Sequence, residues 1–310
     1  MRVLLPICPD TDLQRLGPYF ALRFDTAKID LDVLMVTPQA PTATTGDQGQ
    51  VLDEIARDFI LTYRVRSVRV HLMTGDFTES LVASALQYHS NIILLHDTEG
   101  QGRSFNVGIH KLARQLFKRT RCSLEVVNAS AIAPETAGMP MQVVIPLLAR
   151  ELGSFPCDRL VALPWQRGST LRICMQMPPA FDSNALEVSP SSILLAQEAQ
   201  RDAYPQLEGE LSALCLDLAA RMGEQVDVDF SILEDRTDAL ESLLSTLEGH
   251  TLILQICRGS AKLPAPSPWR RTPPQLAPHS LLLLQAREQG TSSACYRADA
   301  ELGVYPLPVN

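Results

Sequence analysis

Residues 91–128 read NIILLHDTEGQGRSFNVGIHKLARQLFKRTRCSLEVVN. The stretch opens with the apolar run NIILLH (91–96), passes through a glycine-bearing loop and a segment with helical spacing of apolar residues (106–119), and closes with the apolar run SLEVVN (123–128). Short apolar runs on either side of a helix are typical of two parallel strands joined by a crossover. The stretch therefore predicts an α/β fold with a mostly parallel sheet.

The same alternation extends upstream to the beginning of the sequence. Strands are predicted at RVLLPIC (2–8), LDVLMVTP (31–38) and SVRVHLM (67–73), of which the last alternates apolar and polar residues and should have one face in water. Helices are expected between them, at residues 11–25, 51–64 and 77–89, with a polar loop at 37–50. The first 130 residues thus predict a five-stranded sheet with helices on both faces.

The pattern then begins a second time. Four pairs of segments match in the same order: VLLP (3–6) with VVIP (143–146), LDVLMVTP (31–38) with LRICMQMP (171–178), VRVHLMTGD (68–76) with VDVDFSILED (226–235), and NIILLH (91–96) with TLILQI (251–256). Pro6 and Pro146 lie 140 residues apart, whereas the later pairs are offset by about 160, which one insertion within 180–205 explains. The sequence therefore predicts an internal duplication, with a helix at 206–222 in the second copy.

These patterns divide the chain into two domains of ordinary size. We expect domain 1 at residues 1–130, a small-residue and proline-bearing linker at 131–142, a diverged domain 2 at 143–287, and an irregular tail at 288–310. Each domain is long enough to bury its own core.

The composition excludes several classes of protein. The net charge of −8 argues against nucleic acid as a partner. No apolar run approaches the roughly 18 residues that span a bilayer, so we expect no membrane insertion and a cytoplasmic protein. The seven cysteines form no C-x-x-C pair and several lie in apolar runs, which predicts buried reduced thiols and no metal site.

No motif of catalytic chemistry is present. The sequence contains no G-x-S-x-G elbow, no Walker A loop and no Rossmann glycine triad. His96 and Asp97 follow a buried strand, where active-site residues often lie, but we interpret them as a solvated strand end. No catalytic residue is therefore predicted.

The glycine-bearing loop and its surroundings resemble a universal stress protein domain. Such domains open with a strand of the form V-P-V-D, which LLPIC (4–8) echoes, and carry G-x-x-G-x9-G-[ST] after the fourth strand, where this sequence has DTEGQGRSFNVGIH (97–110). The resemblance covers nearly all of residues 1–128 and, more weakly, the second half. It implies two flavodoxin-like domains of the adenine-nucleotide α-hydrolase type in tandem. The motif is degenerate, because Cys8 stands at the aspartate position and Ile109 follows the last glycine.

The resemblance also implies a ligand, ATP or AMP, in domain 1. Glycines let the backbone approach a phosphate closely, and free N–H groups at the next helix's N-terminus point at the anion. The candidate binding residues are Cys8, Asp10, Val36, Gly100, Gly102, Ser104 and Gly108. In domain 2 the corresponding segment is RGSAKLPAPSPWRRTPPQLAP (258–278), whose prolines exclude an ordinary helix, and the role of 261–278 stays open.

Three functions remain open on this basis. The first is a non-enzymatic stress-response or regulatory protein that senses a nucleotide through domain 1. The second is a ligand-free interaction module acting on a membrane transporter or kinase. The third is a nucleotide-hydrolysing enzyme, which the lack of a Ser-Gly-Gly-x-Asp-Ser loop after the first strand disfavours. Family behaviour further implies that the final strands, 123–128 and 280–286, pair with each other, as an intramolecular pseudo-dimer or in a homodimer.

Overall fold

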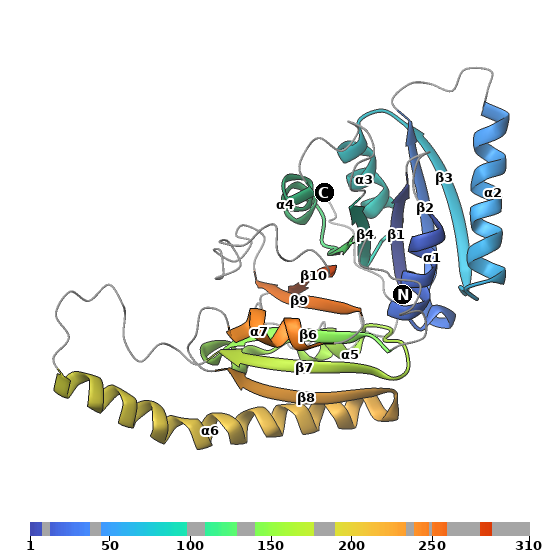
Figure 1. Cartoon of the computed structure of the whole chain (residues 1–310). Coiled ribbons are helices and arrows are strands. Elements are labelled where there is room, and N and C mark those ends of the chain that lie inside the picture. Colours follow the sequence, from blue (N-terminus) through green and yellow to red (C-terminus); the bar gives the residue numbers. More distant parts are fainter. Residues whose placement is uncertain are drawn as a thin grey trace, which may run out of the picture.

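A computed structural model of the chain shows the architecture (Figure 1). The structure describes residues 1–7, 13–37, 45–97, 109–128, 140–176, 190–233, 239–247, 250–258 and 280–286.

Helices and strands alternate through both halves of the chain. The first half contains β1 (Arg2–Ile7), α1 (Leu13–Arg23), β2 (Asp30–Thr37), α2 (Thr45–Leu61), β3 (Ser67–Thr74), α3 (Phe77–Gln87), β4 (Ile92–Asp97), α4 (Ile109–Arg119) and β5 (Ser123–Asn128). The second half contains β6 (Gln142–Leu148), α5 (Cys157–Val161), β7 (Ser169–Gln176), α6 (Pro190–Met222), β8 (Val226–Leu233), α7 (Ala239–Thr246), β9 (Thr251–Arg258) and β10 (Ser280–Ala286). The predicted α/β class is confirmed.

The ten strands in the described part of the chain belong to one sheet, in the order β3-β2-β1-β4-β5-β10-β9-β6-β7-β8. Read outward from the centre, the two halves have the same strand order. Neighbouring strands are parallel within each half, and β5 pairs with β10 in antiparallel orientation. The prediction that the two final strands pair is therefore confirmed, and the pairing is intramolecular. It leaves β3 and β8 as the outer strands of the described sheet.

The pairing registers of the two halves also correspond. Val3 lies opposite Leu31 in β2 and Ile92 in β4. In the second half Val143 lies opposite Leu171 in β7 and Leu252 in β9. Residues at corresponding positions are thus 140 apart in the first two strands and 160 apart in the fourth (252 − 92), the offsets that relate the sequence segments. Descent of the two halves from one duplicated unit stays a prediction.

One face of the sheet carries a core that both halves share. Side chains from α1 and α2 pack there with side chains from α5, α6 and the inward-facing residues of the strands. Phe20 of α1 is fully buried, with its ring centroid 4.8 Å from that of Phe24 and 5.4 Å from that of Phe59. The backbone joins the halves on the same face, since the Asp25 N–H donates to the Pro164 carbonyl over 3.0 Å. The two halves therefore share a single main core.

The opposite face is covered by α3 and α4 in the first half. The helix α3 begins after the N-cap residue Asp76, whose side chain accepts a hydrogen bond from the Glu79 N–H over 2.9 Å. Phe117 of α4 belongs to a buried cluster that also contains Cys257 of β9 and Leu283 of β10. The core on this face thus continues from the first half onto strands of the second half.

Two helices begin earlier than the sequence indicated. The helix α2 starts at Thr45, inside the predicted loop 37–50, and α6 spans 33 residues instead of 206–222. Figure 1 shows α6 running along β8 and continuing past the end of the sheet. Residues 201–206, in that first part of the helix, are all exposed, so no apolar periodicity marked this part of the helix.

Most described cysteines are buried, as predicted. Cys122, Cys174, Cys215 and Cys257 are buried free thiols, and Cys157 is half-buried. Burial raises the pKa of Cys122 to about 11 and that of Cys174 to about 12, so both thiols are protonated at neutral pH. Among the described residues, no helix combines the length and the apolar character needed to cross a membrane.

Candidate functional site

The carboxyl ends of β1 and β4 mark the place in the first half where α/β sheets bind ligands. The chain leaves β1 through α1 toward β2 on one side, and β4 lies on the other side of β1. Ligands bind at such a reversal of strand order, beyond the strands' carboxyl ends. The segments 8–12 and 98–108, which follow β1 and β4, both start from this reversal point.

Most of the predicted binding residues belong to these two segments. Cys8, Asp10, Gly100, Gly102, Ser104 and Gly108 lie outside the described residues. Val36 is described, near the end of β2, and its side chain is buried. His96, interpreted above as solvated, is instead buried at 6% exposure, because β4 lies between β1 and β5 inside the sheet.

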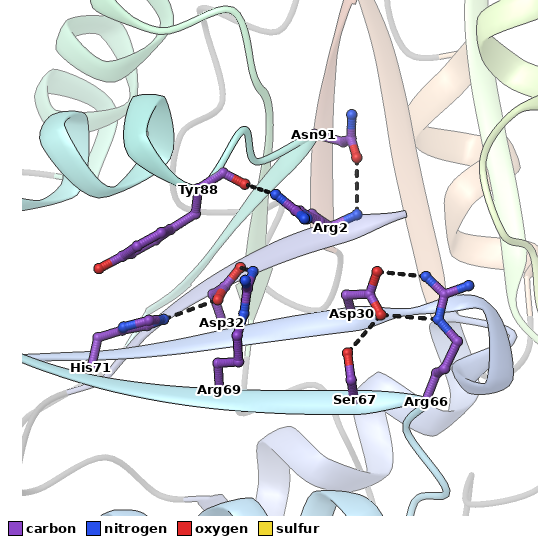
Figure 2. Close-up of polar contacts among 9 residues, drawn as sticks. All are labelled: Arg2, Asp30, Asp32, Arg66, Ser67, Arg69, His71, Tyr88 and Asn91. Atoms are coloured by element: carbon purple, nitrogen blue, oxygen red, sulfur yellow. Dashed lines mark hydrogen bonds and ion pairs between the residues drawn. The ribbon is translucent and has the colours of Figure 1, made fainter. Parts of the chain in front are cut away.

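A second polar group lies on β2 and β3 and was missed at the sequence level. Asp32 is fully buried, and its carboxylate accepts a hydrogen bond from Arg69 Nη2 over 2.8 Å and lies 3.0 Å from His71 Nε2 (Figure 2). The His71 ring stacks on Tyr88 at the C-terminal end of α3, with centroids 4.1 Å apart. We call Asp32, Arg69, His71 and Tyr88 the strand cluster. An aspartate inside the apolar run LDVLMV was the available signal.

The strand cluster has a structural role. A buried carboxylate is tolerated only with hydrogen-bonding partners, and Arg69 and His71 supply them from the neighbouring strand. Asp32 lies near the start of β2, toward the amino ends of the strands. The cluster is therefore away from the edge at which a nucleotide would bind.

Asp30 forms a more exposed ion pair beside this cluster. Its carboxylate accepts hydrogen bonds from Arg66 Nε at 2.9 Å and from the Ser67 hydroxyl at 2.6 Å (Figure 2). The hydrogen bond from Arg66, with a smaller contribution from Ser67, lowers the pKa of Asp30 from 3.8 to about 2. Because this pKa is depressed in the folded state, the pair stabilises the protein above pH 3.8 and loses this effect as the pH falls toward 2.

We expect Arg66→Met to raise the pKa of Asp30 toward its ordinary value of 3.8. The variant loses the charged hydrogen-bond donor that favours the ionised carboxylate. A carboxyl-carbon NMR titration of both proteins measures the shift. Lys28→Met, which removes a cation paired with Asp25 instead, is the control and should leave Asp30 unchanged. Titration of Asp30 near 3.8 in the unaltered protein would contradict the assignment.

The second half carries a counterpart of the strand cluster with its charges exchanged. Arg172 in β7 corresponds to Asp32, and Asp229 in β8 corresponds to Arg69, because both pairs lie directly opposite each other in equivalent ladders. The Arg172 guanidinium lies 3.1 Å from the Asp229 carboxylate. The position thus keeps a cross-strand ion pair while its polarity is reversed.

A third polar group lies where the two halves meet. Glu125 of β5 is fully buried, accepts a 2.5 Å hydrogen bond from the Tyr19 hydroxyl, and lies 3.2 Å from Arg23 Nε. Burial, and secondarily the Glu125 charge, raises the pKa of Tyr19, so the phenol remains a donor. We call Tyr19, Arg23 and Glu125, together with Trp165 and His250, the axial cluster.

The second half contributes the rings of Trp165 and His250 to the axial cluster, and Phe24 of the first half lies beside Trp165. The guanidinium carbon of Arg23 lies 4.3 Å from the Trp165 ring centroid and 4.5 Å from that of Phe24. The Tyr19 ring meets His250 edge-on, with centroids 5.2 Å apart. The Arg23 Nη1 and Nη2 atoms are buried without a hydrogen-bond partner among the described residues, so Glu125 and the two rings balance this cation.

None of the described groups has the form of a metal site. No set of three histidine, cysteine, aspartate or glutamate residues in the described part of the chain could hold an ion. The strand and axial clusters instead consist of internally paired charges. The candidate functional site is therefore the reversal point at the ends of β1 and β4.

Comparison with known proteins identifies the fold. No family model and no curated protein matches the sequence. Among solved structures, the chain is similar to a universal stress protein from Archaeoglobus fulgidus, with 11% identity, a TM-score of 0.52, and coverage of 92% of this chain and 98% of the other. It is also similar to a functionally unknown protein from Pseudomonas aeruginosa, with 13% identity, a TM-score of 0.50 and 92% of both chains covered.

A third similar structure is the cytoplasmic domain of a prokaryotic cation chloride cotransporter. The identity is 14%, the TM-score is 0.50, and the match covers 91% of this chain and 95% of the other. These similarities cover both halves of the chain. The chain therefore has the universal stress protein fold.

Proposed function

We propose that the protein is a non-enzymatic regulatory protein that acts in the cytoplasm and binds an adenine nucleotide, ATP or AMP, in its first half. The observation that carries the proposal is the reversal of strand order at β1, with the glycine-bearing segment 98–108 leading from β4 toward α4. Glycines there allow close approach to phosphate, and α4 offers its N-terminal N–H groups. A role in the stress response is part of this proposal.

The sequence of the second half favours placing the nucleotide site in the first half. Its corresponding segment, between β9 and β10, contains the prolines of 261–278, and proline lacks the N–H group that would contact an anion. We therefore assign at most one nucleotide to each chain.

Thermal unfolding with and without nucleotides tests the proposal. We expect millimolar ATP or AMP to raise the melting temperature, because a ligand at 100 times its dissociation constant stabilises the folded state by about 2.7 kcal/mol. The series includes ADP and cyclic nucleotides, each with and without magnesium. Gly108→Val should abolish the shift, since a branched side chain would occupy the place of the phosphate.

Gly209→Val provides the matched control. This glycine lies in α6, and a Cβ placed on it would meet nothing within 4 Å, so the nucleotide shift should persist. A shift that survives Gly108→Val would move the site elsewhere, and no shift with any nucleotide would contradict nucleotide binding. Release of phosphate or ADP over time would contradict the non-enzymatic assignment.

A ligand-free regulatory module is the second candidate. It is favoured by the similarity to the cytoplasmic domain of a cation chloride cotransporter, in which this fold belongs to a transport protein. In that case the protein would act on a membrane transporter or a kinase through its surface, and every nucleotide would leave the melting temperature unchanged.

A further inference from the structure

The two halves of the sheet are related by an approximate twofold axis that passes through one pair of residues. In β5 and β10, Leu281 lies opposite Val126, Leu282 opposite Glu125, and Leu283 opposite Leu124. Ser123 and Ser280 are topologically equivalent, because they lie opposite Ile92 and Leu252 at matching positions of the two halves. Glu125 lies two residues after Ser123, and Leu282 lies two residues after Ser280, so Glu125 and Leu282 are equivalent as well. The axis therefore places these two equivalent residues directly opposite each other.

The two residues of this central pair, Glu125 and Leu282, differ in chemical character. Glu125 is a buried carboxylate with Tyr19 and Arg23 as its partners, whereas Leu282 is fully buried in the shared core. One buried anion thus meets one apolar side chain at the axis. The guanidinium from the first half balances that anion, and Trp165 from the second half covers the guanidinium.

A pair of two first halves, joined in the same register, would be very different. It would place Glu125 directly opposite Glu125, with side chains about 5 Å apart in a site closed to water. Trp165 is equivalent to Asp25 by the offset of 140, so the ring that covers Arg23 would also be replaced by a carboxylate. The two Glu125 carboxylates would then face each other in a medium of low dielectric constant, and each Arg23 would lose its aromatic cover, which is strongly unfavourable.

We infer that Glu125 prevents the first half from pairing with a second copy of itself and reserves its central edge for the second half. Two second halves would meet through Leu282 and carry no such repulsion. Each pair of two second halves, however, leaves two first halves without a partner, because first halves do not pair with each other. Exclusion of one like pair therefore favours the unlike pair for all halves by mass action. Self-association of the whole chain must then use other surfaces.

Cleavage of the folded full-length chain tests this inference without requiring either half to fold alone. A protease site is inserted within residues 131–139, the folded protein is cleaved, and the halves are left to exchange. Native mass spectrometry then distinguishes unlike pairs from the two kinds of like pair by mass. We expect the squared abundance of the unlike pair, divided by the product of the abundances of the two like pairs, to exceed its value for random pairing by about 100-fold or more, since two buried carboxylates that face each other repel strongly.

The double variant Arg23→Met/Glu125→Leu removes the ion pair and should bring the distribution close to the statistical one. Asp30→Leu/Arg66→Met removes an exposed ion pair of the same half and should leave the distribution of the unaltered protein. Circular dichroism of the uncleaved chains verifies folding. Abundant pairs of first halves in the unaltered protein, separation of its halves after cleavage, or an unchanged distribution in the Arg23→Met/Glu125→Leu variant would each overturn the inference.

Leu282→Glu gives an independent readout from the opposite side of the axis. It places a second carboxylate against Glu125 in the unlike pair, so we expect the affinity between the cleaved halves to fall by about 100-fold. An affinity equal to that of the unaltered halves would also overturn the inference.

Discussion

Replacement of Glu125 by leucine is expected to destabilise the protein by about 3–5 kcal/mol, the cost of breaking a buried ion pair from one side. The Arg23 guanidinium is fully buried, and its Nε lies 3.2 Å from the Glu125 carboxylate. In the variant this cation faces two aromatic rings without an anion, and the Tyr19 hydroxyl loses its acceptor as well. Denaturant unfolding followed by circular dichroism measures the difference.

Two further variants separate charge from packing. Asp30→Leu removes the acceptor of an exposed pair and should cost no more than about 1 kcal/mol. Arg23→Met/Glu125→Leu removes both buried charges and should recover most of the stability lost in Glu125→Leu, because apolar replacements of a buried pair are often neutral. Equal losses in the single and the double variant would show that packing, and not charge, determines the stability of the axial cluster.

Replacement of Trp165 by alanine should also destabilise the protein by about 3–5 kcal/mol. The indole is 4% exposed, donates from Nε1 to the Leu160 carbonyl over 2.8 Å, and covers the Arg23 guanidinium. Its removal leaves a cavity where the halves meet and exposes one face of a buried cation. The same unfolding experiment measures the loss, with Tyr204→Ala as the control, since that aromatic ring is 42% exposed and should change stability by less than about 0.5 kcal/mol.

A double-mutant cycle with Arg23→Met tests whether the contact itself contributes. Residues in contact typically show coupling of about 0.5–3 kcal/mol. We expect Trp165→Ala and Arg23→Met to be coupled within this range, in the sense that each costs less once the other is present. Additive effects would mean that Trp165 stabilises the shared core independently of Arg23.

Most of the fold could be predicted from the sequence because most strands and helices are marked by patterns within short segments of the chain. The apolar runs that became β1, β2 and β4 are buried on both faces, so they appeared as uninterrupted hydrophobic segments. The N-cap at Asp76 depends on a contact only three residues away. The start of α6 was missed because residues 201–206 are all exposed, so no apolar stripe marked this part of the helix.

The polar clusters could not be predicted in the same way. The Tyr19–Glu125 hydrogen bond joins residues 106 apart, and the Asp32–His71 contact joins residues 39 apart. Local spacing contains no information about such pairs, which are defined by strand order and register. His96 was misjudged for a related reason, since its burial depends on neighbours that lie far from it in the sequence. The ends of β1 and β4 were predictable, because alternation of strands and helices already implies a reversal point.

The antiparallel contact between β5 and β10 has a consequence for communication within the molecule. It reverses the direction of every strand in the second half relative to the first, so the carboxyl ends of β1 and β4 and those of β6 and β9 lie at opposite borders of the sheet. A ligand held at one border is therefore beyond the reach of the loops at the other. Any cooperativity between the two borders must be transmitted through the body of the protein, where the buried axial cluster around Glu125 joins the two halves.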